Sequence, residues 1–178
     1  MAGWAFGIAA FLGAPSDEAA LIWAKVYYLF PIVIAIGLTI FTTSFPDKKR
    51  VVWLAVVPAL VGGIILALTL LIQRDFLTAT IVEHDWGREV LLTTSHYLIY
   101  SVYLLLFYGL ALVVMYRKSL HEKGIFANQA RLFFCGFLVT FIFGVGCNLL
   151  LPWFGNYRLI WLGPLFLAVF AVIIAYSI

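Results

Sequence analysis

Few residues in this 178-residue chain have the chemistry to serve a reaction or a metal ion, and one group of them is clustered. Glu83, His84 and Asp85 are consecutive, and Glu89 follows shortly after. Carboxylates and an imidazole so close together could bind a divalent ion. A solvated cluster of charges is the simpler interpretation, and it is the one we adopt. The sequence therefore predicts no metal site.

The long apolar segments hold no pattern typical of catalysis. An intramembrane enzyme would normally place ionisable or nucleophilic groups together at mid-span. The polar side chains at that depth are hydroxyls and thiols without an acid or a base beside them, namely Thr39, Thr69, Ser101, Cys135, Thr140 and Cys147. The two cysteines lie about 18 Å apart along one expected helix, too far for a disulfide. We predict no catalytic residue and no cofactor.

A few polar and aromatic residues could form a ligand site. Asn148 lies near the outer end of an apolar segment, and its amide needs hydrogen-bond partners. His96 and Tyr100 share one face of another expected helix, and Tyr157 and Trp161 are expected at the same level. Together these residues predict a shallow cleft that opens outward. The alternatives are a helix-end cap for Asn148 and a bundle core or interfacial belt for the aromatic face.

The amino-acid composition indicates what kind of structure holds these residues in place. Hydrophobic residues make up 65% of the chain, charged residues 11%, and the mean hydropathy is +1.11, which indicates a membrane protein. The net charge of +3 is too small to indicate nucleic-acid binding. Runs of about 20 apolar residues match the hydrocarbon core of a bilayer. Five runs are long enough to span it, at 19–43, 51–72, 95–116, 132–151 and 159–178.

A shorter apolar segment at 2–13 precedes these five, and Ser16 or Asp17 could cap the helix that follows it. The sequence contains no internal repeat and no low-complexity linker. The predicted fold is all-α: a polytopic transmembrane helical bundle with five full spans and a partial N-terminal helix. It forms a single domain over residues 1–178.

The charges of the connecting segments predict the orientation. Basic residues dominate the connections at 46–50 and 117–131, and acidic residues dominate those at 14–18 and 73–94. By the positive-inside rule the first two connections are cytoplasmic. Every span then alternates in direction, and the C-terminus lies in the cytoplasm. The predicted location is the inner (plasma) membrane, crossed several times.

Small residues at four-residue spacing predict how the helices pack. Such stripes let helix backbones approach closely within a membrane. They are Ala55, Ala59, Gly63 and Ala67 in one span, and Gly136, Thr140 and Gly144 in another. They could be contacts within one chain, which is the simpler interpretation, or a dimer or switch interface.

Several short motifs resemble a known family. These are the run from Asn148 to Pro152, the run from Trp161 to Phe166, and the end of the chain from Ile174 to Ile178. Together with Asn128-Gln129 they are similar to the N-terminal seven-transmembrane region of bacterial sensor histidine kinases. The resemblance implies an extracellular N-terminus, a cytoplasmic C-terminus, signalling domains after the last helix, and a dimer. It also implies that the family's first helix and part of its second are not in this chain.

From these observations we expect a membrane-embedded sensory input domain that relays an extracellular or in-membrane signal to a histidine kinase-type domain. We expect the chain itself to be non-enzymatic and truncated at both ends. The phospho-accepting histidine would lie in the absent part, so none of His84, His96 and His121 is assigned that role. Expected partners are membrane lipids, a second copy or another membrane subunit, and an unidentified small molecule or peptide. The alternative function is a small structural subunit of a membrane complex.

Overall fold

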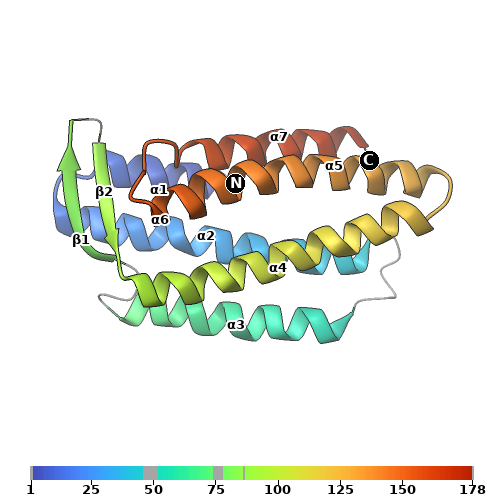
Figure 1. Ribbon diagram of the computed structural model, residues 1–178, viewed down its shortest axis with the longest axis horizontal. Helices are drawn as coiled ribbons and strands as arrows, with labels where there is room; N and C mark the ends of the chain where they lie inside the picture. The colour runs from blue at the N-terminus through green and yellow to red at the C-terminus, as the bar shows by residue number, and fades with distance from the viewer. Residues whose placement is uncertain (1, 46–51, 74–77, 86, 178) are drawn as a thin grey trace.

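The computed structural model describes residues 2–45, 52–73, 78–85 and 87–177. Its elements, in chain order, are α1 (Ala2–Leu12), α2 (Asp17–Ser44), α3 (Trp53–Ile72), β1 (Thr78–His84), β2 (Gly87–Leu92), α4 (Thr94–His121), α5 (Ile125–Val145), the π-helix η2 (Gly146–Leu150), α6 (Leu151–Trp153) and α7 (Leu162–Ser177). Figure 1 shows an elongated bundle with the two strands at one end, which we call the hairpin end, and the C-terminus toward the opposite end.

The predicted class, an all-α transmembrane bundle, is confirmed. Within the described residues, α2, α3, α4 and the continuous helical stretch Ile125–Trp153 are long and apolar enough to cross a membrane. Helix α1 is short, as predicted, and runs from the middle of the bundle to the hairpin end (Figure 1). Helix α7 is shorter than the span predicted at 159–178, because residues 159–161 form turns before it begins.

Two β-strands between α3 and α4 were not predicted as strands. Residues of this segment alternate between apolar and polar, and the β-branched Ile81, Val82 and Val90 favour an extended backbone. The strands pair antiparallel, with Ile81 opposite Val90 and Glu83 opposite Arg88. Val90 is fully buried, and the Arg88 guanidinium donates to the carbonyl of Ala14 in the α1–α2 turn. The hairpin therefore covers one end of the bundle.

Side chains near the helix ends join neighbouring helices. Ser16 caps α2 by accepting a hydrogen bond from Ala19 N at 3.3 Å, as predicted. Lys25 Nζ donates to Gln73 O at 3.0 Å, just past the C-terminus of α3. Lys118 Nζ donates to Thr42 O at 2.6 Å and to Phe45 O at the C-terminus of α2. A cation at a helix C-terminus stabilises it, since the last carbonyls carry partial negative charge.

The basic connections differ in how much of them the structure describes. Lys48, Lys49 and Arg50 lie outside the described residues. The connection predicted at 117–131 is mostly helical, because α4 continues to His121 and α5 begins at Ile125. Only residues 122–124 form the turn, where Gly124 has φ +63°. Core residues lie mainly between α1, α2, α4, α5 and α7, and α3 packs on the outer side of α2 and α4 (Figure 1).

Candidate functional site

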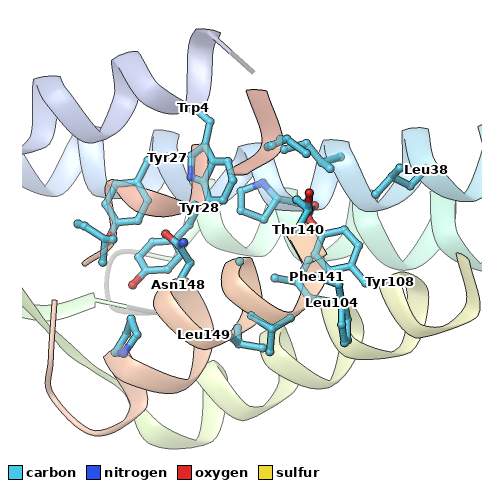
Figure 2. A pocket seen from close by; sticks show the side chains of 18 of the residues that line it. Trp4, Tyr27, Tyr28, Leu38, Leu104, Tyr108, Thr140, Phe141, Asn148 and Leu149 are labelled. Carbon is cyan, nitrogen blue, oxygen red and sulfur yellow. Dashed lines mark hydrogen bonds between the residues drawn. The ribbon is translucent and has the colours of Figure 1, made fainter. Parts of the chain in front are cut away.

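A cavity of about 60 Å³ lies among α1, α2, α4, α5 and α7, close to the joint between α5 and α7. Figure 2 shows side chains from several helices pointing into it. Apolar and aromatic side chains form most of its wall. None of the described residues that line it is charged; they include Trp4, Tyr27, Tyr28, Pro31, Tyr100, Leu104, Tyr108, Phe137, Thr140, Gly144, Asn148, Gly163 and Leu167.

The π-helix η2 forms the wall beside Asn148. Pro152 follows η2 and lacks the N–H that would bond to the carbonyl of Asn148 four residues earlier. The Tyr97 hydroxyl from α4 donates to Leu149 O at 2.8 Å and lies 3.4 Å from Asn148 O. Within a membrane, a backbone carbonyl that lacks a donor in its own helix needs a hydrogen-bond donor from a neighbouring helix. Irregular turns of this kind inside long helices often mark functional sites.

Asn148 ties η2 to the start of α7. With its amide nitrogen toward the Ile160 carbonyl, it donates to Ile160 O at 2.7 Å and accepts from Gly163 N at 3.2 Å. The amide satisfies one N–H in the first turn of α7, which has no partner within the helix itself. One side chain thus closes the joint between two helices at the edge of the cavity.

Three further tyrosines of α4 donate to backbone carbonyls of other helices. Tyr100 Oη donates to Tyr28 O at 3.0 Å, and Tyr108 Oη donates to Pro31 O at 2.9 Å, both in α2. Tyr103 Oη donates to Ala59 O of α3 at 2.8 Å. Tyr100 and Tyr108 also line the cavity. The hydroxyls of α4 therefore fix the wall formed by α2.

The residues predicted to form one cleft are divided between several places. Tyr100 and Asn148 line the cavity among the helices. Tyr157 lines a second cavity, of about 200 Å³, between β2 and α6, together with Glu89 and Trp153. Burial raises the pKa of the Tyr157 hydroxyl far above its usual range, so this hydroxyl stays neutral.

His96 and Trp161 are not among the residues that line either cavity. His96 is half-buried, and Trp161 is 54% exposed. Sequence reasoning missed Trp4, Tyr27 and Tyr28, which α1 and α2 contribute to the wall. The signal that could have found the last two is their position one helical turn before Pro31, which has no N–H to donate to a carbonyl of that turn.

The small-residue stripes face different surroundings. At Gly136 a Cβ would lie 3.1 Å from the Phe170 ring, so α5 and α7 touch closely there, and Thr140 Oγ1 also donates to Phe166 O at 3.2 Å. At Gly63 a Cβ would lie 2.6 Å from Tyr103 Oη. At Gly144, which is among the residues that line the cavity, it would meet nothing within 4 Å. Ala59 is buried, whereas Ala55 and Ala67 are half-buried on the same helix.

The side chains of the charged cluster in the hairpin contact one another in pairs. His84 Nε2 lies 2.8 Å from Glu89 Oε2, and Arg88 lies 3.5 Å from Glu83. Over the described ranges, no group of three or more histidine, cysteine, aspartate or glutamate side chains could hold a metal ion.

The family of the chain follows from a comparison of its whole length. A model of the N-terminal 7TM region of histidine kinase matches residues 1–178. No curated protein and no solved structure matches the chain. The match covers the complete bundle, including the cavity and the joint at Asn148. The chain therefore belongs to the family of N-terminal seven-transmembrane regions of histidine kinases.

Proposed function

We propose that this chain is the sensory input region of a sensor histidine kinase and that it detects an extracellular or in-membrane stimulus in the cavity beside η2. The observation that carries the proposal is the position of Asn148, which lines the cavity and also holds the first turn of α7. A molecule that enters the cavity reaches the residue on which the start of α7 depends. Family membership supports a sensory role, and an uncharged wall suits a stimulus that reaches the site through the membrane.

In this proposal the signal leaves the bundle through α7. Hydrogen bonds between helices in a membrane contribute only about 0.6 kcal/mol each on average. A ligand that binds one arrangement of η2 and α7 more tightly can therefore shift the population between two arrangements. The tight contact at Gly136 and the bond from Thr140 to Phe166 couple this movement to α5.

The remaining features of the proposal come from the charge pattern and the family. The C-terminus lies in the cytoplasm of a cell whose inner membrane holds the bundle, and the catalytic domains follow α7 in the native polypeptide. Two copies form a homodimer, as expected for kinases that phosphorylate within a pair. Catalysis then belongs to the following domains and not to this bundle.

A test combines the mass of the native polypeptide with its kinase activity. An antibody against the 117–131 segment detects the polypeptide in its own membranes, and labelled ATP reports autophosphorylation. We expect a mass far above the 19.9 kDa of this chain, with label in the same band. A band near 20 kDa without label would sink the proposal and would favour a free-standing structural subunit.

A matched pair of variants tests the role of the cavity. Gly144→Val adds a side chain to a residue that lines the cavity. Gly109→Val adds the same side chain to α4, at a residue that does not line the cavity and where a Cβ also meets nothing within 4 Å. We expect Gly144→Val to change basal autophosphorylation about fivefold or more, the lower end of usual coupling between sites. Gly109→Val should leave it unchanged. Equal behaviour of the two variants would remove the cavity from the mechanism.

A further inference from the structure

Glu89 lines the larger of the two cavities, and one of its carboxylate oxygens is not bonded to any described residue. That cavity, of about 200 Å³, lies between β2 and α6. Glu89 Oε2 lies 2.8 Å from His84 Nε2, and a carboxylate oxygen only accepts, so the histidine donates. Glu89 Oε1 has no such donor among the described residues. The side chain is 13% exposed, and Oε1 is not among the enclosed polar atoms that lack a partner, so a ligand can reach it.

A glycine leaves the space beside this oxygen open. Gly155 lies in the turn after α6 and has φ +74°, a conformation that side chains disfavour. A Cβ at this position would lie 3.7 Å from Glu89 Oε1. Apart from its own chain neighbours, it would meet nothing else within 4 Å. The turn therefore passes close to the carboxylate without covering it.

The rest of the wall carries no charge. Glu89 is the one charged side chain among the described residues that line this cavity; the others are Val90, Leu91, Leu92, Thr94, Tyr97, Pro152, Trp153, Gly155 and Tyr157. Tyr97 and Trp153 bring two aromatic rings to it, with centroids 5.6 Å apart. Aromatic rings attract cations, and so does a carboxylate. An acceptor with a negative charge in an apolar and aromatic wall suits a cation that has a carbon skeleton.

The size of the cavity and the number of its ligands argue against a metal ion. Calcium takes six to eight oxygen ligands, and the described residues hold no group of three acidic, histidine or cysteine side chains that could bind a metal. The volume of about 200 Å³ has room for about a dozen water molecules, or for an organic molecule of about ten non-hydrogen atoms. The positive-inside rule predicts that this end of the bundle faces the external solution, from which a soluble cation would arrive.

We infer that the cavity between β2 and α6 binds a small organic ammonium ion, whose N–H donates to Glu89 Oε1 and whose carbon chain packs against the apolar wall. This is a different cavity from the one in the proposed function, and the inference does not rest on that function. A cavity filled by solvent alone is the competing interpretation.

The test compares two probes with the same carbon chain. At neutral pH 3-methylbutylamine carries an ammonium group, and 3-methyl-1-butanol carries a hydroxyl in its place, so the two differ in charge. The protein is purified in an uncharged maltoside detergent, and its melting temperature is measured against the concentration of each probe. We expect half-maximal stabilisation by the amine at a concentration about tenfold lower than by the alcohol, as one hydrogen bond to a charged group can provide.

Substitutions locate the effect. Glu89→Gln removes the charge and keeps the shape of the side chain, and we expect it to abolish the preference for the amine. Glu83→Gln is the matched control, because it removes the same charge from the same hairpin at a side chain that is 74% exposed and outside the cavity. His84→Gln is a second control, since it changes the contact to Glu89 but leaves the carboxylate in place. Both controls should keep the preference.

Each contrary outcome overturns the inference for a different reason. Equal half-maximal concentrations of amine and alcohol, or no stabilisation by either, would leave the cavity to solvent. Loss of the preference in Glu83→Gln would mean that the total charge of the hairpin attracts the amine. Loss of the preference in His84→Gln would mean that the structure of the hairpin, and not the charge of Glu89, decides binding. None of these measurements uses autophosphorylation, so failure here leaves the proposed function standing, and the reverse also holds.

Discussion

Asn148 and Gly163 are in such close contact that a Cβ at position 163 would overlap the side-chain amide of Asn148. The same Cβ would lie 2.9 Å from Trp4 Cη2. Only glycine fits at position 163 without displacing a neighbour, because the side-chain amide of Asn148 lies against the backbone of α7 at that residue. Three helical segments, α1, η2 and α7, therefore meet at a residue without a side chain.

The first prediction concerns Gly163→Ala. The added methyl group must displace the Asn148 amide or the Trp4 ring, so we expect a loss of about 1–3 kcal/mol of stability, typical of overpacking. Thermal unfolding in detergent measures it. Gly146→Ala is the control, because a Cβ there meets nothing within 4 Å and alanine favours helix. Equal destabilisation by both substitutions would contradict the contact.

The second prediction is a coupling between Asn148 and Gly163. In an Asn148→Ala background the main obstacle to a methyl group at position 163 is gone. The destabilisation caused by Gly163→Ala should therefore fall by about 1 kcal/mol or more, within the range seen for residues in contact. The four unfolding curves of a double-mutant cycle measure it. Strictly additive effects would show that the two residues do not touch.

The third prediction concerns the tyrosines of α4. Tyr100→Phe removes the hydroxyl that donates to Tyr28 O and should cost about 0.6 kcal/mol, the average for a hydrogen bond between helices in a membrane. Tyr116→Phe on the same helix is the control, since Tyr116 is 49% exposed. Unfolding by SDS titration compares the two. A smaller effect at Tyr100 than at Tyr116 would argue against the bond to α2.

The fourth prediction concerns Lys118. Lys118→Met keeps an unbranched chain as long as the lysine stem but removes the ammonium group that bonds to Thr42 O and Phe45 O at the C-terminus of α2. We expect a loss of about 1 kcal/mol, as for a cation at a helix C-terminus. Lys123→Met serves as control, because Lys123 is exposed in the α4–α5 turn. Faster proteolysis near residue 45 in Lys118→Met alone would support the same conclusion.

Hydropathy predicts the membrane helices well because it reports the apolar core of each one. It misses their polar ends: α4 continues five residues past Tyr116, and α5 begins seven residues before Leu132. Arginine, lysine, leucine, alanine and glutamine favour helix, so these ends stay helical where hydropathy falls. The hairpin was missed for another reason. Its alternation is visible in the sequence, but two strands are stable only when a bundle lies under them.

The site could be predicted only in part. Asn148 was recognisable as a polar residue within an apolar segment, yet its partners at Ile160 and Gly163 depend on how α7 folds back. Nothing in the composition of residues 146–150 distinguishes a π-helix from an α-helix. Trp4 and Tyr27 come from helices far from Asn148 in sequence, and only the packing of α1 and α2 brings them to the same cavity.

The two tyrosine bonds next to Pro31 have a mechanical consequence. A helix with an internal proline bends easily at that point, because one backbone hydrogen bond is missing. In α2 the carbonyl of Pro31 and the carbonyl three residues before it are both held by hydroxyls of α4. Lys118 holds the far end of the same helix. We therefore expect α2 and α4 to move as one rigid unit, so that a displacement at the hairpin end is passed to the opposite end and is not lost by bending at Pro31.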